Sequence, residues 1–169
     1  MADKRILVVG LGNPILTDDG VGVLVAYEVE RILDKIDDNA ITVTEASVGG
    51  LRLMELMIGY GHVILVDAFC PNDGSPTNPG QIHHMTFDDL KNVIPTQHSA
   101  SAHDTSLVTA FDIGASIGLN LPKTVSIYAV EVENIYDFGE EPTPAVAAAI
   151  PRLVTAILDE LEIKMEKIQ

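Results

Sequence analysis

The sequence is poor in cysteine, in basic residues and in long apolar runs, and each shortage excludes a class of protein. Its single cysteine, Cys70, excludes an internal disulfide and a cysteine-based zinc or iron-sulfur centre. Ten Lys and Arg residues against 25 Asp and Glu residues give a formal net charge of -15, which disfavours nucleic acid and anionic membranes as partners. The first apolar run, residues 6–9, is too short for a secretory signal or a membrane span, so we expect a cytoplasmic protein.

What remains is the composition of a folded globular protein. The chain has 169 residues, of which 47% are hydrophobic and 21% charged. This length is typical of one domain with a proper core, and the composition is far from that of a disordered chain. We therefore expect a single domain over residues 1–169, and the high negative charge favours a monomer.

Strand and helix patterns alternate along the chain. Apolar runs predict strands over residues 6–9 and 63–66, and further strands are predicted over residues 41–45, over 81–86 after a loop rich in proline and glycine, and over 125–132. Helical spacing of apolar residues predicts helices from about residue 19 to 37–39, over 51–57, over 105–116 with a cap at Asp104 or Thr105, and from Thr143-Pro144 onward. The pattern indicates an α/β fold, a three-layer α/β/α sandwich with a mostly parallel sheet of about five strands, of the phosphorylase/hydrolase-like kind.

Candidate functional residues gather where parallel strands end, which is where open α/β sheets bind their ligands. Asp19 lies in the loop after the first strand, Asp67 ends the third strand, and His103 precedes a helix. Each has a structural explanation as well, as a helix cap, a strand end or a surface histidine. Their shared edge favours a site for nickel, zinc or a similar divalent ion, with His98 as an alternative to His103.

The other histidines are better explained as structural. His62, His83 and His84 lie at or near strands. Adjacent strand residues point to opposite faces of a sheet, so His83 and His84 cannot easily bind one ion together.

Several other chemistries lack their motifs. Gly10 and Gly12 begin a dinucleotide-binding pattern, but the third glycine is missing and the acidic residues that follow would repel a pyrophosphate, so we expect no nucleotide cofactor. No G-x-S-x-G nucleophile elbow and no H-E-x-x-H zinc helix is present. Cys70 has acidic neighbours, which disfavour the thiolate, so we interpret it as a structural thiol.

The segment of residues 10–22, GLGNPILTDDGVG, resembles the opening signature of the nickel-iron hydrogenase maturation endopeptidases. Further resemblances are Val66-Asp67-Ala68, Ser101-Ala102-His103 with Leu107, and Gly139 with the Thr143-Pro144 helix start. Together they cover nearly the whole chain. The sequence around His103 is similar to that of an archaeal-type branch of the family. This similarity implies that the precursor processed belongs to a coenzyme F420-reducing hydrogenase.

The resemblance implies an endopeptidase that removes the C-terminal extension of a nickel-iron hydrogenase large-subunit precursor after nickel insertion. It implies that Asp19, Asp67 and His103 bind the metal. From this we expect that the nickel is supplied by the substrate and acts as a checkpoint. We also expect Asn13, Gly49 and Gly50 to contact the substrate.

Two positions depart from the family pattern. Many relatives carry glutamate where this chain has Asp19, and many have an aspartate followed by Gly-Thr where it reads Glu45-Ala46-Ser47. Glu133 matches a glutamate often seen in the family, and we expect a structural or rim role for it.

Two routes to hydrolysis stay open. Either the metal polarises the carbonyl or activates water, or Asp19 and Asp67 act as general base and acid in an aspartic-type mechanism. Alternatives from other classes are a non-enzymatic metal- or nucleotide-binding chaperone of hydrogenase assembly and an oxidoreductase.

Overall fold

The computed structural model describes residues 4–36, 39–71, 76–92 and 102–163, and the side chains of residues 102–106 lie outside the description. Strands and helices follow one another in the order β1 (Ile6–Leu11), η1 (Thr17–Gly20, a 3-10 turn), α1 (Val21–Leu33), β2 (Ile41–Ala46), α2 (Gly50–Met57), β3 (His62–Phe69), β4 (Ile82–Thr86), α3 (Phe87–Asn92), α4 (Ala102–Ser116), β5 (Thr124–Glu131) and α5 (Pro144–Glu160).

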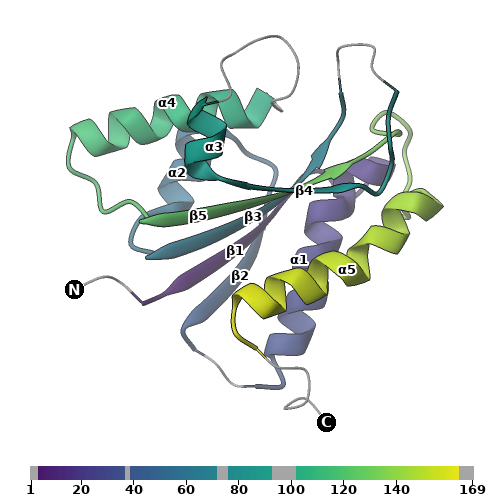
Figure 1. Cartoon of the computed structure of the whole chain (residues 1–169), viewed down its shortest axis with the longest axis horizontal. Coiled ribbons are helices and arrows are strands. Elements are labelled where there is room, and N and C mark those ends of the chain that lie inside the picture. The colour runs from purple at the N-terminus through teal and green to yellow at the C-terminus, as the bar shows by residue number, and fades with distance from the viewer. Residues whose placement is uncertain (1–3, 37–38, 72–75, 93–101, 164–169) are drawn as a thin grey trace.

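The five strands form one sheet in the order β2-β1-β3-β5-β4. Strands β2, β1, β3 and β5 run parallel, and β4 pairs with β5 antiparallel at the edge. Helices α1 and α5 cover one face of this sheet, and α2, α3 and α4 cover the other (Figure 1). The predicted three-layer α/β/α sandwich with a mostly parallel sheet is confirmed.

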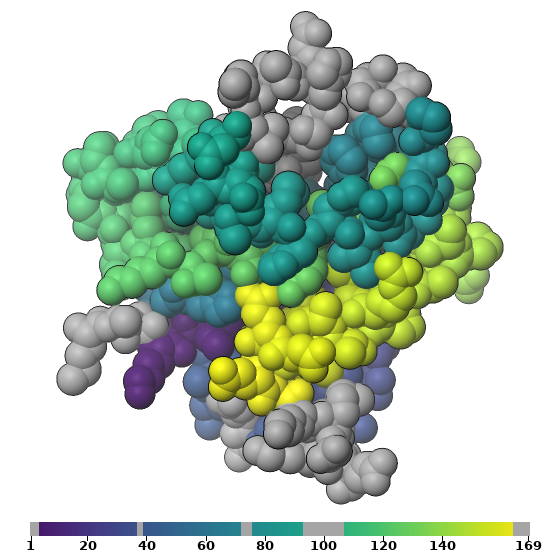
Figure 2. Space-filling model, in the orientation of Figure 1, coloured from purple at the N-terminus to yellow at the C-terminus, as the bar shows by residue number. Residues whose placement is uncertain are grey.

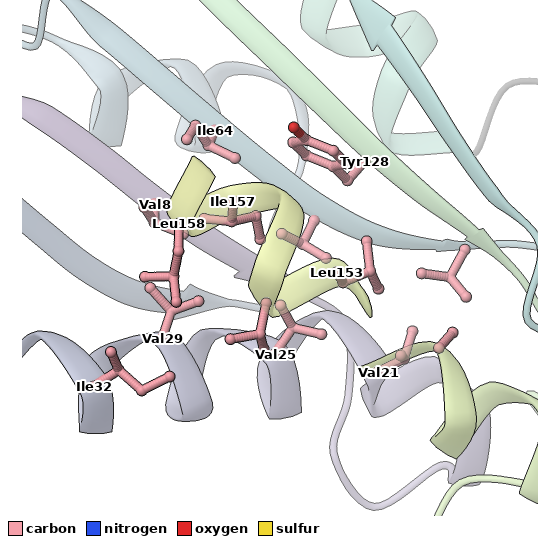
Figure 3. Close-up of a cluster of buried hydrophobic side chains, with 14 of the residues drawn as sticks. Val8, Val21, Val25, Val29, Ile32, Ile64, Tyr128, Leu153, Ile157 and Leu158 are labelled. Atoms are coloured by element: carbon pink, nitrogen blue, oxygen red, sulfur yellow. The ribbon is translucent and has the colours of Figure 1, made fainter. Parts of the chain in front are cut away.

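The core has two halves, one on each face of the sheet. In the first half, α1 and α5 pack against alternate residues of the strands, including Val8, Ile64 and Tyr128 (Figure 3). In the second half, Leu7, Leu65 and their neighbours pack against α2, α3 and α4. Side chains along a strand alternate between the two faces of the sheet. The face to which a polar strand residue points therefore follows from the apolar residues on either side of it.

Several predicted boundaries are wrong. The first helix ends at Leu33 rather than at 37–39, and α4 begins at Ala102, so neither Asp104 nor Thr105 is its N-terminal cap. The short helix α3 was not predicted, because six residues show too little periodicity to be recognised. Cys70 is half-buried directly after β3, where it packs against the first half of the core.

Within the described ranges, no helix combines the length and apolar character needed to cross a membrane.

Candidate functional site

The site region lies where β1 and β3 end side by side. The chain leaves β1 through α1 and returns to β2 on one side, and then leaves β2 through α2 to reach β3 on the other side. The connections after β1 and β3 therefore diverge at this point, which is where open α/β sheets have their binding crevice. Of the candidate residues predicted from the sequence, Asp19 and Asp67 lie in the segments that meet at this edge.

Asp67 is the most buried of the candidates whose side chains the structure describes, with 6% of its surface exposed. It lies inside β3, which continues to Phe69, and is not the residue that ends the strand as predicted. Val63 and Leu65 point into the half of the core under α2 and α4, so Asp67, two residues further, faces the same side. Its Oδ1 accepts the N–H of Ala68 at 2.9 Å, which helps to fix the carboxylate.

The backbone at the start of α1 packs against the backbones of β1 and β3 at a distance that only glycine allows. A Cβ added at Gly22 would lie 2.3 Å from the carbonyl oxygen of Val66, the residue before Asp67. A Cβ added at Gly12, where φ is +126°, would lie 1.9 Å from the backbone oxygen of Asp19. These glycines bring the backbone of the β1–α1 loop directly against the end of β3.

Asp19 lies in the 3-10 turn η1, before the first residue of α1, and is half-buried. Its Oδ2 accepts the backbone N–H of Asn13 at 2.8 Å, so the loop itself orients the carboxylate. Asn13 was predicted as a substrate contact, and its N–H is used to hold Asp19. The amide oxygen of Asn13 accepts the N–H of Ile15 at 3.2 Å. The loop thus stabilises its own conformation and presents Asp19 at the edge where Asp67 lies.

Asp18, the neighbour of Asp19, is fully buried and has a structural role that the sequence did not reveal. Its Oδ1 accepts the N–H of Thr143 at 2.7 Å. Its Oδ2 accepts the N–H groups of Glu133 at 3.3 Å and Asn134 at 3.0 Å, and the hydroxyl of Thr143 at 3.1 Å. These bonds tie the β1–α1 loop to the segment between β5 and α5. Glu133 itself is exposed, and its structural or rim role stays a prediction.

Gly49 and Gly50 lie at the same edge, where β2 passes into α2. Gly49 is the N-terminal cap residue of α2, and Gly50 has φ +57°. The hydroxyl of Ser47 donates to the backbone oxygen of Gly12 at 2.7 Å, so the β2–α2 connection is fastened to the β1–α1 loop. The structure thus puts both glycines beside the loop that carries Asp19, while their contact with a substrate stays a prediction.

His103 is the second residue of α4, rather than a residue of the loop before it as predicted. It lies one helical turn before Leu107, which is fully buried in the half of the core that Asp67 faces. Its side chain and the whole of His98 lie outside the described residues. The choice between the two histidines is therefore not tested.

A ready-made metal centre is not found among the described side chains: they contain no group of three His, Cys, Asp or Glu residues that could hold an ion. Asp19 and Asp67 supply oxygen donors, and a third protein ligand would have to come from a residue such as His103. Carboxylate and imidazole donors suit a divalent transition metal.

His83 and His84, the two histidines of β4, point to opposite faces of the sheet, as predicted. His83 lies in register with Ala129, which is itself in register with Asp67, so all three share one face. Its Nε2 lies 3.3 Å from Oε2 of buried Glu131. His84 stacks on Tyr128 on the other face, with ring centroids 4.5 Å apart. Both histidines therefore have structural partners.

A second polar cluster lies on the α5 face of the sheet, opposite to the face that Asp67 points to. Glu160 accepts hydrogen bonds from Ser126, from Tyr128 at 2.6 Å, and lies 2.9 Å from Nε2 of His62. Burial alone would raise the pKa of Glu160, but the hydrogen bonds from His62, Ser126 and Tyr128 outweigh it and lower the pKa to about 2. Burial, followed by the bond to Glu160, raises the pKa of the Tyr128 phenol. This cluster fastens the end of α5 to the sheet.

Comparison with known proteins gives a consistent result. A family model described as hydrogenase maturation protease matches residues 16–160. A protein of Methanocaldococcus jannaschii named as a hydrogenase maturation protease is 32% identical over 108 residues, which cover 63% of this chain and 65% of that protein. The hydrogenase expression/formation protein HupD of Bradyrhizobium diazoefficiens is 26% identical over 144 residues, 85% of this chain and 71% of HupD.

Solved structures share the fold. The hydrogenase maturating endopeptidase HybD from Escherichia coli superposes with a TM-score of 0.72 at 24% identity, covering 94% of this chain and 92% of HybD. The maturation protease HycI from Thermococcus kodakarensis gives a TM-score of 0.67 at 20% identity, covering 94% and 93%. At these identities the likeness is one of fold.

Proposed function

This chain belongs to the hydrogenase maturation protease family, and on that premise we propose that it is the endopeptidase that removes the C-terminal extension from a nickel-iron hydrogenase large-subunit precursor. We propose further that it cleaves after nickel insertion, because its candidate residues recognise the metal that the precursor carries. The observation that supports this most is the placement of Asp67, buried within the last residues of β3, close to the loop that holds Asp19.

In this proposal nickel belongs to the substrate. Asp19, Asp67 and His103 offer oxygen and nitrogen donors to the open positions of the precursor's nickel, and this contact places the scissile peptide bond at the edge of the sheet. An enzyme that held its own nickel permanently could not sense whether the precursor is loaded. The proposal therefore requires weak nickel binding by the protein alone.

Hydrolysis then needs a water molecule that attacks the carbonyl carbon of the scissile bond. The water loses one proton to a base, the C–N bond breaks, and the departing amine gains a proton from an acid. Asp19 and Asp67 provide two carboxylates for these transfers, and nickel provides an alternative means of activating the water. The two routes predict different behaviour of the variants described next.

The test is a cleavage assay in which nickel-loaded precursor is incubated with the protein and the products are weighed by mass spectrometry. We expect loss of a C-terminal peptide, slowed by about 100-fold or more in Asp19→Asn, Asp67→Asn and His103→Ala. Matched controls are Asp112→Asn, an exposed residue of α4, and His84→Ala, on the opposite face of the sheet; both should cleave at the wild-type rate.

Binding of the precursor separates the two routes and the alternative function. If Asp19→Asn and Asp67→Asn still bind loaded precursor but do not cleave it, the carboxylates act in proton transfer. If they lose the binding of loaded precursor, they act as nickel ligands. Strong binding by the wild-type protein without cleavage of any hydrogenase precursor would contradict the proposal and favour a chaperone.

A further inference from the structure

The segment between β5 and α5, residues 132–143, exposes two aromatic side chains to solvent. Tyr136 is 80% exposed and Phe138 is 84% exposed. We propose that this segment, called here the aromatic loop, is a docking surface for the folded body of the large-subunit precursor, separate from the residues that recognise the metal. This inference rests on the proposed function and deepens it.

The aromatic loop is held in place by hydrogen bonds at its two ends. Buried Asp18 accepts the N–H groups of Glu133, Asn134 and Thr143, so the first and last residues of the loop converge on one carboxylate. The N–H of Asp18 in turn donates to the backbone oxygen of Asn134 at 2.9 Å. The loop is therefore closed across its base.

Its central part is held as well. The side-chain oxygen of Asn134 accepts the N–H groups of Tyr136 at 3.4 Å and Asp137 at 3.2 Å. The Thr17 hydroxyl donates to the backbone oxygen of Asp137 at 2.6 Å, and the Thr17 N–H donates to the backbone oxygen of Gly139 at 2.8 Å. The backbone on both sides of the two aromatic residues is thus fixed. Pre-ordered residues lose little conformational entropy on binding, which favours affinity.

A third exposed apolar side chain, Ile15, lies on the loop that is hydrogen-bonded to the aromatic loop. The backbone oxygen of Ile15 accepts the N–H of Gly139 at 3.0 Å, and the Ile15 side chain is 49% exposed. Ile15, Tyr136 and Phe138 therefore project from two neighbouring loops. The chain just before α5 lies on the outer surface at the right side of the molecule in Figure 2. Aromatic residues are enriched in the energetically dominant parts of protein interfaces, and exposed apolar patches mark such sites.

Charge indicates what kind of partner fits. Residues 133–141 contain four acidic side chains, Glu133, Asp137, Glu140 and Glu141, and no basic one. A second copy of this chain, with its net charge of -15, would bring the same negative field and be repelled. The complementary surface is basic at its rim and apolar at its centre. We therefore assign the occupant as such a surface on the precursor.

The position of the aromatic loop explains why docking there would assist cleavage. Asp18 anchors the loop, and the next residue in the chain is Asp19. A precursor body seated on Tyr136 and Phe138 is thereby held against the same rigid segment that presents the candidate metal-recognising carboxylate. Fixed relative positions of this kind increase the effective concentration of the scissile bond.

The test compares Tyr136→Ser/Phe138→Ser with Ile117→Ser. The control also removes an exposed apolar side chain, but from the residue that follows α4, where 68% of Ile117 is exposed. Dissociation constants and the KM and kcat for full-length, nickel-loaded precursor are measured for each. We expect the double variant to raise Kd and KM about tenfold or more, with kcat at saturating precursor and Tm unchanged. Ile117→Ser should match the wild-type protein in all four quantities.

A charge variant provides an independent check. Glu140→Lys/Glu141→Lys should slow association with the precursor, and the salt dependence of the association rate should weaken. Both residues are exposed, so Tm should be unchanged.

Three results would overturn the docking surface. One is a Kd of the double variant equal to that of the wild-type protein. Another is a fall in kcat with KM unchanged, which would mean that the loop acts on the chemical step. The third is wild-type self-association that the double variant abolishes, because the occupant would then be a second copy. If the wild-type protein neither binds nor cleaves any precursor, the proposed function fails, and the docking surface fails with it.

Discussion

Replacing Asp18 by asparagine tests how the candidate site is supported. Oδ1 of Asp18 faces one donor, the N–H of Thr143, and Oδ2 faces three, the N–H groups of Glu133 and Asn134 and the Thr143 hydroxyl. An asparagine side chain has one oxygen and one NH2 group in place of the two carboxylate oxygens. The NH2 group must therefore replace either Oδ1, where it faces the N–H of Thr143, or Oδ2, where it faces three donors. At least one hydrogen bond to a charged acceptor is lost, and a buried donor is left without a partner.

The expected cost follows from these bonds. A hydrogen bond to a charged group contributes about 1.5 to 3 kcal/mol, and an unsatisfied buried donor adds to the loss, so Asp18→Asn should reduce the free energy of unfolding by about 2 to 4 kcal/mol. For a domain of this size, each kcal/mol lowers Tm by roughly 2 to 4 °C. Urea unfolding at pH 7, followed by circular dichroism, measures the free energy directly.

Asp137→Asn is the matched control. Asp137 is exposed, and its carboxylate accepts one bond, from the Asn134 side chain at 3.0 Å. The same substitution there should cost no more than about 1 kcal/mol. Equal stability of Asp18→Asn and Asp137→Asn would refute the reasoning, because the bonds to Asp18 would then not support the loop.

Three further predictions concern stability and nickel. Glu160→Gln should destabilise the protein at pH 7, because the folded state lowers the pKa of Glu160 from 4.5 to about 2. The difference in unfolding free energy from the wild-type protein should persist above about pH 4.5 and shrink as the pH falls toward 2. A pH-independent difference in urea unfolding would contradict this. Gly22→Ala should lower the free energy of unfolding by about 3 kcal/mol or more, because the new Cβ lies 2.3 Å from the Val66 oxygen. Gly118→Ala has open space around it and φ +78°, so it should cost only about 1 kcal/mol of backbone strain. Equal losses in thermal unfolding would show that the close contact does not matter. Calorimetry should detect only weak nickel binding by the protein alone, and a tight complex would argue against nickel as part of the substrate.

The strands were predictable because their burial is directly visible in the sequence. Residues 6–9 and 63–66 are continuous apolar runs, and residues 125–132 are apolar apart from Ser126 and Glu131, as expected for parallel strands covered on both faces. Boundaries were less predictable. Asp104 and Thr105 are good N-terminal caps by residue type, yet α4 begins at Ala102, because contacts elsewhere in the fold decide where a helix begins.

The site was predictable only in part. The rule that ligands bind beyond strand ends selects Asp19 and Asp67, and the structure places both at the β1/β3 edge. The sequence could not tell which of two neighbouring carboxylates, Asp18 or Asp19, turns inward. That choice depends on a 3-10 turn in which Thr17 has φ +48°, and the turn is fixed by residues more than 100 positions away. Pairings of such long range leave no local pattern in a single sequence.

The measurement that tests the central claim most directly is the single-turnover cleavage rate of nickel-loaded against nickel-free precursor, followed by intact-mass spectrometry. If Asp19, Asp67 and His103 recognise the precursor's nickel, the loaded precursor should lose its C-terminal peptide at least about 100-fold faster than the nickel-free one, and Asp67→Asn should remove this difference. Equal rates for the two precursors with the wild-type protein would contradict the account.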